Sequence, residues 1–316
     1  MNIYYFGSAL NLSSIYMIAG AGAAISLKSG KLNLGGEGQI YCGGFVCAVL
    51  LNFFSQFIQV QNGQFNCFIP LFVLISFIMS FFICGLQTLF CSFLQIKKKA
   101  DYLFTTYILS AATIPFIDGL IAGPARSKTD NLLATPFIHK SFRFSQIMPP
   151  SALNLSFFGA ILILFFFFFL IYRTAYGRKL CILGISQEFS RFAGYDIPKL
   201  YYSSSFISGG MHGLAGACAI CGTYYACHSG FYTGMGWNAF STSLLAMSNP
   251  LLILPSSIFM GFLTTYSNKF ALYNNFAFDM TSLLQGTIIL IISFITPKKK
   301  YWGLSPFKII WINVEF

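Results

Sequence analysis

The chain alternates long apolar runs with short polar stretches. Apolar runs of about 18 residues or more recur, and each is long enough to cross the roughly 30 Å hydrocarbon core of a bilayer. Because backbone groups in lipid need partners within the protein, such spans are helical. No segment shows the strict alternation expected of the strands of a transmembrane β-barrel. We therefore expect an all-α, polytopic bundle of transmembrane helices.

The order of these runs predicts about eight or nine spans, with short or broken helices among them. The expected spans are 4–27, 40–58, 68–96, 102–121, 152–172, 200–228, 236–248, 251–266 and 276–296. Segment 236–248 is short and weakly apolar, and Asn249-Pro250 interrupts the chain directly after it. The longest polar stretches, 123–151 and 173–199, are too short for a folded soluble domain. We therefore expect residues 1–316 to form a single integral-membrane domain.

Charge adds an orientation to this picture. Only 9% of the residues are charged and the net charge is +11, but the basic residues cluster at 97–99, 173–179 and 298–300, each beside an apolar run. This is the positive-inside pattern, which reports topology rather than nucleic-acid binding. We therefore expect the chain to contact membrane lipid. The pattern predicts an outside N-terminus, a cytoplasmic C-terminus and a cytoplasmic loop at 173–199. Loop 123–151 is then external, although it carries four basic residues.

Residues that could perform chemistry are few. The nine cysteines lie mostly in apolar runs, and the Cys218–Cys221 pair falls inside an expected span, where small packing residues are more common than redox or metal sites. The only histidines are His139, His212 and His228, and no catalytic, metal-binding or phosphate-loop motif is present. We expect a non-catalytic protein that itself binds no metal or cofactor.

One carboxylate stands out in the polar stretch between the first two spans. Glu37 lies among glycines in KSGKLNLGGEGQ, residues 28–39. A carboxylate close to membrane depth is costly and suggests a function in a substrate pathway. The structural alternative is that Glu37 caps a helix start or pairs with Lys28 or Lys31. Both interpretations stay open on the residues alone.

The second informative stretch is GRKLCILGISQEFSRFAGYDIPK, residues 177–199. Its pattern predicts a short amphipathic helix at Glu188–Ala193, a stop at Gly194 and a proline before the next span. Such a surface helix could dock a partner protein or lie on lipid. The alternative is a loop that is only solvated.

Five segments, in order along the chain, carry a family resemblance. They are NLGGEGQ at 33–39, NLLATPFI at 131–138, residues 177–195, SGGMHGLAGA at 208–217 and FSTSLLAMSNPL at 240–251. Together they resemble signatures of permease subunits of ABC importers for nucleosides, simple sugars and, in some members, riboflavin. The segment at 131–138 is similar to an external-loop motif of the nucleoside-type branch. Cys181-Ile182 and Ser186 depart from the family's usual Arg-Ala and Asn in the cytoplasmic loop.

The resemblance implies a permease in the cytoplasmic (inner) membrane that forms a translocation pathway with a second, homologous or identical, permease subunit. It also implies cytoplasmic ATP-binding subunits, which would bind ATP and Mg in place of this chain, and an external substrate-binding protein. The residues expected to couple to the ATPase are Gly184, Glu188, Phe189, Arg191, Phe192 and Gly194. Those expected in the pathway or a gate are Asn33, Glu37, Gln39 and Asn249.

The expected cargo is a small heterocyclic nutrient, a nucleoside or riboflavin, and an aromatic content of 18% would suit stacking on a flat ring. A simple-sugar ABC permease is one alternative. An ion-coupled secondary transporter is another, and it would be expected to carry intramembrane ionisable groups and an internal repeat. Besides Glu37, only Asp118 and Asp279 are candidates for such groups, and no repeat is evident.

Overall fold

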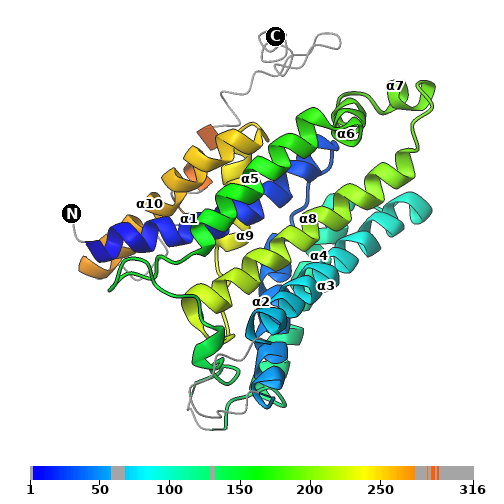
Figure 1. The fold of residues 1–316 in the computed structure, drawn as a ribbon. Coiled ribbons are helices and arrows are strands. Elements are labelled where there is room, and N and C mark those ends of the chain that lie inside the picture. The colour runs from blue at the N-terminus through cyan, green and yellow to red at the C-terminus, as the bar shows by residue number, and fades with distance from the viewer. Residues whose placement is uncertain are drawn as a thin grey trace.

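The fold is a bundle of helices that run between two ends of the molecule (Figure 1). The computed structural model describes residues 3–57, 68–128 and 132–274, and 283, 286–288, 290 and 291 beyond them. In this part the chain forms helices and irregular loops, with isolated β-bridges at Ala134–His228 and Gln146–Asn154. The all-α prediction is thus confirmed. Most of the expected span 276–296 lies outside the described residues.

Six helices of the described part are long and apolar enough to cross a membrane. They are α1 (Ile3–Lys28), α2 (Gly36–Ser55), α3 (Ile69–Lys98), α4 (Tyr102–Ala122), α5 (Ser156–Arg173) and α10 (Pro250–Tyr273). Between α5 and α10 lie α6 (Ala175–Ile185), α7 (Gln187–Phe192), α8 (Ile197–Ala219) and α9 (Met235–Leu245). The predicted polytopic bundle is therefore present, and its short helices fall between α5 and α10.

Helix α1 is the centre of the bundle. It packs against α5, α8, α9 and α10, and 83% of its most apolar 18-residue window is buried, against 22% for α3 and for α5. A helix enclosed on all sides needs no polar face. In its C-terminal half, the glycine and alanine residues from Ala19 to Ala24 pack against the neighbouring helices. The apolar outer surfaces of α3 and α5 are what the chain presents to its surroundings.

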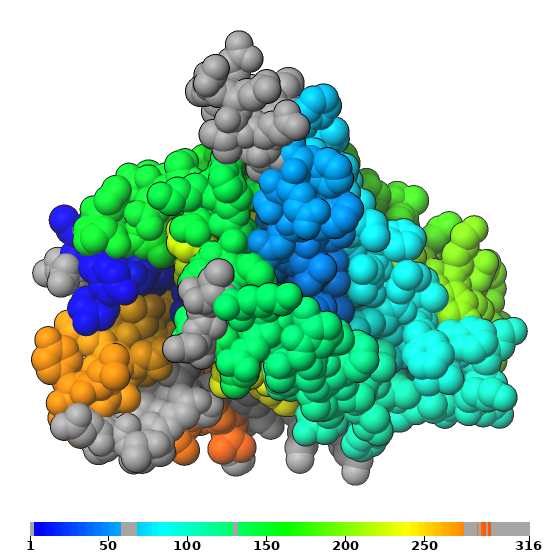
Figure 2. Space-filling model, turned by 90° about the horizontal axis from the view of Figure 1, so that it is seen from below, coloured from blue at the N-terminus to red at the C-terminus, as the bar shows by residue number. Residues whose placement is uncertain are grey.

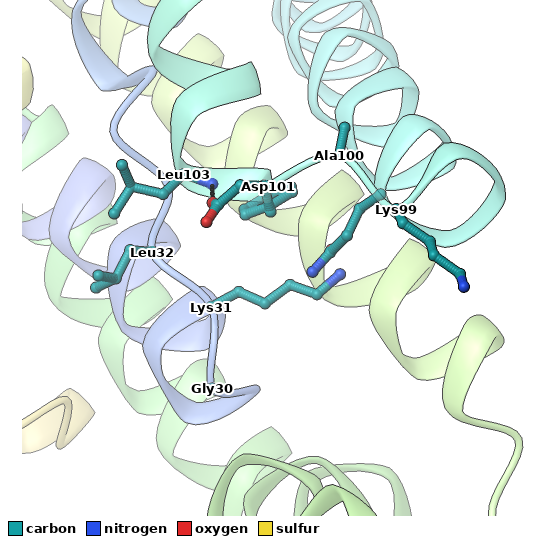
Figure 3. Close-up of a pocket in the computed structure, with 9 residues that line it drawn as sticks. Gly30, Lys31, Leu32, Lys99, Ala100, Asp101 and Leu103 are labelled. Carbon is teal, nitrogen blue, oxygen red and sulfur yellow. Dashed lines mark hydrogen bonds between the residues drawn. The ribbon is translucent and has the colours of Figure 1, made fainter.

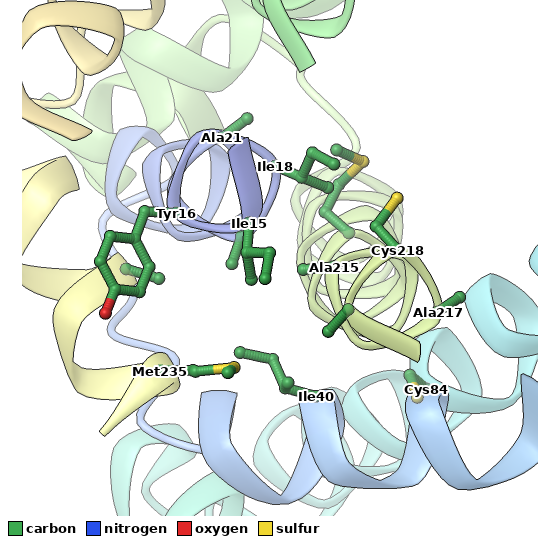
Figure 4. Close-up of a cluster of buried hydrophobic side chains, with 14 of the residues drawn as sticks. Ile15, Tyr16, Ile18, Ala21, Ile40, Cys84, Ala215, Ala217, Cys218 and Met235 are labelled. Carbon is green, nitrogen blue, oxygen red and sulfur yellow. The ribbon is translucent and has the colours of Figure 1, made fainter. Parts of the chain in front are cut away.

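Glycines on α8 allow the closest helix contacts. A Cβ on Gly216 would overlap the carbonyl oxygen of Ile40 in α2, and one on Gly213 would overlap the carbonyl oxygen of Ser80 in α3. Figure 4 shows the resulting core, where Ala215 of α8 and Ile40 of α2 face Ile15 of α1. Close backbone approach supplies packing between helices in lipid, where the hydrophobic effect gives none.

The helix in the expected span 200–228 ends earlier than predicted. Helix α8 ends at Ala219, a π-helical turn follows at Ile220–Tyr224, and Tyr225 takes a left-handed conformation with φ 58°. The next residues are apolar, but their carbonyl groups pair with the segment after α4: Ile138 N–H donates to Tyr225 O at 2.8 Å and Thr135 N–H to Cys227 O at 2.9 Å. Tertiary pairing, and not hydropathy, ends the helix here.

Residues 123–128 and 132–155, together called the 123–155 cover, fold back over the end of the bundle where α4 stops and α5 begins. Figure 2 shows this segment (green) on the centre of the face seen from below, next to α2 (blue). Buried Asn154 fastens it, because its amide donates to Asn11 Oδ1 in α1 at 2.8 Å and to Gly222 O at 3.1 Å. The segment expected as an external loop is therefore an ordered cover on one end of the molecule.

Helix α9 is a half-length helix. Its 11 residues rise about 16 Å, roughly half of the hydrocarbon thickness. The remaining depth is covered by the irregular chain from Tyr225 to Gly234, which starts at the 123–155 end. Segment 236–248 was expected as a short or broken span, and its helix is indeed short.

The opposite end of the bundle collects most of the basic residues. In the described part it carries Lys28, Lys31, Lys97, Lys98, Lys99, Arg173, Arg178, Lys179, Arg191 and Lys199. Helices α6 and α7 lie at this end (Figure 1). A single basic end is what the positive-inside pattern requires, and the cytoplasmic location of this end stays a prediction.

Candidate functional site

The turn between α1 and α2 re-enters the bundle. After Lys28 the chain bends back, and the side chain of Asn33 forms a reciprocal amide pair with Gln39, with N···O distances of 3.0 and 3.1 Å. Asn33 also donates to Ser208 Oγ in α8 at 3.0 Å and accepts from Gly35 N–H at 3.0 Å. Both amides are buried. Every one of these bonds fixes the start of α2 deep in the protein.

Helix α4 supplies hydrogen-bond acceptors to the same turn. Leu34 N–H donates to Thr106 Oγ1 at 3.3 Å, and Gly38 N–H donates to Ser110 Oγ at 2.8 Å. Gly38 N–H belongs to the first turn of α2, whose amides have no partners within the helix, and Leu34 lies just before that helix. Serine and threonine on a neighbouring span thus replace the water that would satisfy them at a surface.

Glu37 lies between the starts of two helices, α2 and α9. It is the second residue of α2, and its carboxylate accepts from the backbone N–H of Gly234 at 2.8 Å. Gly234 is the residue before α9 and has φ +77°. A Cβ on Gly236, in the first turn of α9, would overlap the backbone N of Glu37. The half-buried carboxylate therefore lies at two helix N-termini, whose partial positive charges favour an anion.

Three of the four residues expected in the pathway or gate are thus brought together, namely Asn33, Glu37 and Gln39. Asn249 is not. It caps α10, accepting from Leu251 N–H at 3.1 Å, and it follows the C-terminal end of α9, whereas Glu37 lies at the N-terminal end. The length of α9 places about 16 Å between these two ends.

An aromatic group that sequence reasoning missed lies next to Glu37 on the side of the 123–155 cover. The Tyr41 hydroxyl donates to Asp118 Oδ1 at 2.6 Å, and Ser229 Oγ donates to the same oxygen at 2.7 Å. The Tyr41 ring lies 4.5 Å from that of Tyr232 and 5.6 Å from that of Phe231. Tyr41 is four residues after Glu37, on the same face of α2, which is the signal that could have found it.

Lys31 is the buried cation of the α1–α2 turn. Its side chain is 5% exposed, its ammonium lies 3.5 Å from the ring centre of Tyr201 and 4.9 Å from that of Tyr102, and it donates to Ser92 Oγ at 3.4 Å. Burial lowers the pKa of Lys31 to about 7. Pairing of Glu37 with Lys28 or Lys31 was one of the interpretations left open by the sequence, and the Glu37 carboxylate accepts from Gly234 N–H.

Helices α6 and α7 form the surface expected to bind an ATPase. Thr174 caps α6, Ser186 caps α7 through a 3.2 Å bond from Phe189 N–H, and Gly194 ends the segment with φ +73°. The short helix and its glycine stop were both predicted. Glu188 and Arg191 are exposed, and so are the apolar side chains of Phe189 at 58% and Phe192 at 91%. Two exposed phenylalanines on one turn of helix are typical of a surface that binds another protein.

This surface rests directly on the α1–α2 turn. A Cβ on Gly184, near the end of α6, would overlap the carbonyl oxygen of Lys28 and lie 3.0 Å from Gly30 N. Tyr176, in the first turn of α6, shares a 2.9 Å hydrogen bond with Ser203 of α8. Helix α6 therefore contacts the backbone of the turn that leads to Asn33 and Glu37.

Comparisons with known proteins agree with this architecture. A family described as "Branched-chain amino acid transport system / permease component" matches residues 5–293. The chain is 28% identical over 290 residues to the probable riboflavin import permease protein of Treponema pallidum, covering 92% of this chain and 74% of that protein.

Two further relatives are more distant. A guanosine ABC transporter permease protein of Bacillus subtilis is 24% identical over 297 residues, covering 92% of this chain and 81% of the relative. A glucose ABC transporter permease protein of Haloferax volcanii is 20% identical over 293 residues, covering 87% and 72%. No solved structure matches the chain significantly.

Proposed function

We propose that this chain, which belongs to the branched-chain amino acid transport system permease component family, is the membrane-spanning subunit of an ATP-driven importer for a nucleoside or riboflavin. The riboflavin and guanosine permeases among its relatives support this cargo class. The chain would form the pathway with a second permease subunit in the cytoplasmic membrane. Cytoplasmic ATPase subunits would hydrolyse ATP, and an external binding protein would deliver the cargo.

One observation carries the proposal: the exposed α6–α7 surface contacts the backbone of the α1–α2 turn. That turn leads into the start of α2, where Glu37 bonds to the residue before α9. ATP-driven closure of the ATPases would move α6 and α7 as a rigid body. The start of α6 is fixed by the Thr174 side chain and the start of α7 by the Ser186 side chain. The contact of Gly184 with Lys28 and Gly30 would pass that movement to Glu37. Two helix starts that share one carboxylate form an element that can be biased between inward-open and outward-open states.

The aromatic group next to Glu37 would contact the cargo. Of its three rings, Tyr232 is half-buried and can be reached, whereas Tyr41 and Phe231 are buried and hold it beside the acceptor Asp118 and the carboxylate of Glu37. Flat heterocycles stack on such rings, and their N–H groups need acceptors. A sugar would use the same acceptors but gains less from contact with the Tyr232 ring, which is why we favour a heterocyclic cargo.

Uptake by cells that express the chain with its partner subunits tests the proposal. Labelled guanosine and riboflavin are offered with glucose as the comparison cargo. Replacement Tyr232→Ala should lower heterocycle uptake about tenfold, whereas Phe165→Ala, which removes an exposed aromatic ring of α5, should leave it unchanged. Uptake of glucose alone would support the simple-sugar alternative. Uptake that continues after ATP depletion and stops when ion gradients collapse would support the ion-coupled alternative.

A further inference from the structure

A cavity of about 560 Å³ opens at the basic end of the molecule, away from Glu37 and the aromatic group. The α1–α2 turn, the end of α3 and the start of α4 line it (Figure 3). Its volume falls within the roughly 300–1,000 Å³ of small-ligand sites. The cavity lies where α1, α3 and α4 reach their ends, which is the depth of lipid headgroups when these helices span the bilayer.

The charges that line the cavity are mainly positive. Lys31 and Lys99 contribute two ammonium groups, and Figure 3 shows Lys31 extending from the α1–α2 turn toward the end of α3. The one carboxylate, Asp101, already accepts from Leu103 N–H at 2.8 Å and so caps α4. The first turn of α4 adds its own partial positive charge. The lining therefore favours an anion.

Lys31 is a buried cation that lacks a charged partner. Among the described residues, the contacts of its ammonium are with uncharged groups, and the cavity's carboxylate, Asp101, bonds to Leu103 N–H. The ammonium has tyrosine rings and the Ser92 hydroxyl around it, and these do not neutralise its charge. Burial of an uncompensated charge is expensive unless an ion of opposite sign is nearby. An anion in the cavity would provide it.

The cavity lining also holds an unsatisfied acceptor. The buried Oε1 atom of Gln95 has no hydrogen-bond partner among the described residues. A buried acceptor without a donor costs stability, so a ligand that donates a hydrogen bond here would be favoured. A phosphate group next to a hydroxyl supplies the anion for Lys31 and Lys99 and the donor for Gln95.

We infer that this cavity binds the phosphate-bearing headgroup of an anionic phospholipid such as phosphatidylglycerol. Basic pockets between helix ends at a membrane surface are suited to such headgroups. The headgroup would rest against the α1–α2 turn, whose Gly30 contacts Gly184 of α6. Occupancy would thus stiffen the turn that supports the α6–α7 surface. A soluble phosphate compound has the same chemistry, and the experiment separates the two sources.

The test is a lipid titration of the purified full-length chain, followed by native mass spectrometry and thermal melting. Phosphatidylglycerol should bind at least tenfold more tightly than phosphatidylcholine and raise the melting temperature more. Lys31→Gln and Lys99→Gln should each reduce that preference about tenfold. Lys199→Gln removes an exposed lysine outside the cavity and serves as the matched control. Lys99 is itself exposed, so its variant tests the site even when Lys31→Gln folds poorly.

Inorganic phosphate is titrated in a second arm, in phosphatidylcholine alone. Stabilisation by inorganic phosphate that requires Lys31 and Lys99, without a preference for phosphatidylglycerol, would support the phosphate site and overturn its lipid source. Equal responses of the wild-type chain and both cavity variants in both arms would overturn the site itself.

Discussion

Glu37→Gln is the substitution that tests most directly how the starts of helices α2 and α9 are held together. The amide keeps the shape of the side chain and an oxygen that can still accept from Gly234 N–H, which lies 2.8 Å from the carboxylate. The replacement therefore removes the charge while preserving the contact. Any change in stability reports the interaction of that charge with the starts of α2 and α9.

The magnitude follows from three contributions. A hydrogen bond to a charged acceptor contributes about 1 kcal/mol more than one to a neutral acceptor. A negative charge at a helix N-terminus contributes about 0.3–1 kcal/mol, and Glu37 is placed at two of them. Because the half-buried amide is less costly to desolvate than the carboxylate, about 1 kcal/mol is recovered. The net loss in free energy of unfolding is about 1–2 kcal/mol.

Thermal melting of the full-length chain in detergent measures this loss. At roughly 2 °C per kcal/mol for a chain of this size, Glu37→Gln should lower the melting temperature by about 2–4 °C. Glu37→Ala should lower it further, because Gly234 N–H then loses its acceptor. Glu188→Gln, in an exposed carboxylate of α7, is the control and should melt like the wild type. Equal melting of the Glu37→Gln and Glu188→Gln variants would refute the reasoning.

Three further predictions concern the basic end of the molecule. Reversing the charges of exposed Glu188 and Arg191 should abolish co-purification of the ATPase without lowering the melting temperature, and unchanged co-purification and transport would contradict the coupling assignment. Gly184→Val should reduce transport strongly while the ATPase still binds, because its side chain would overlap the carbonyl oxygen of Lys28; full transport would show that this contact transmits nothing. Because burial lowers the folded-state pKa of Lys31 to about 7, against about 10.4 in the unfolded chain, the unfolded chain binds more protons between these values. Stability should therefore rise with pH from about 7 to about 10, and Lys31→Met should remove this rise in melts at pH 7 and 9.5.

Much of the secondary structure was predictable because its signals are local. The short helix at 187–192 and its stop at Gly194 follow from an amphipathic turn and a residue that tolerates φ +73°. The start of α10 follows from Asn249, whose side chain caps the helix before Pro250. The end of α8 was not predictable in this way, since residues 225–228, which continue a largely apolar run, leave the helix to pair with the 123–155 cover.

The candidate site was only partly predictable. Asn33 and Gln39 are six residues apart, and their mutual hydrogen bonds lie within the motif that marked the stretch. Tyr41 could have been added from its helical spacing to Glu37. Asp118 and Tyr232 could not have been added as its neighbours, because they come from other elements of the fold.

The sequence by itself determined which segments are apolar enough to span a membrane, where they are interrupted, and which surface helix carries exposed phenylalanines. These properties depend on transfer into lipid and on capping, which act within a few residues. The tertiary structure alone decided that Glu37, at the start of α2, bonds to Gly234, which precedes α9 and lies 197 residues later in the chain. It also decided that Lys31 turns to tyrosine rings and a cavity instead of to Glu37. Such pairings depend on which helix backbones can approach closely, and Gly236 of α9 allows the approach to Glu37 only in the assembled bundle.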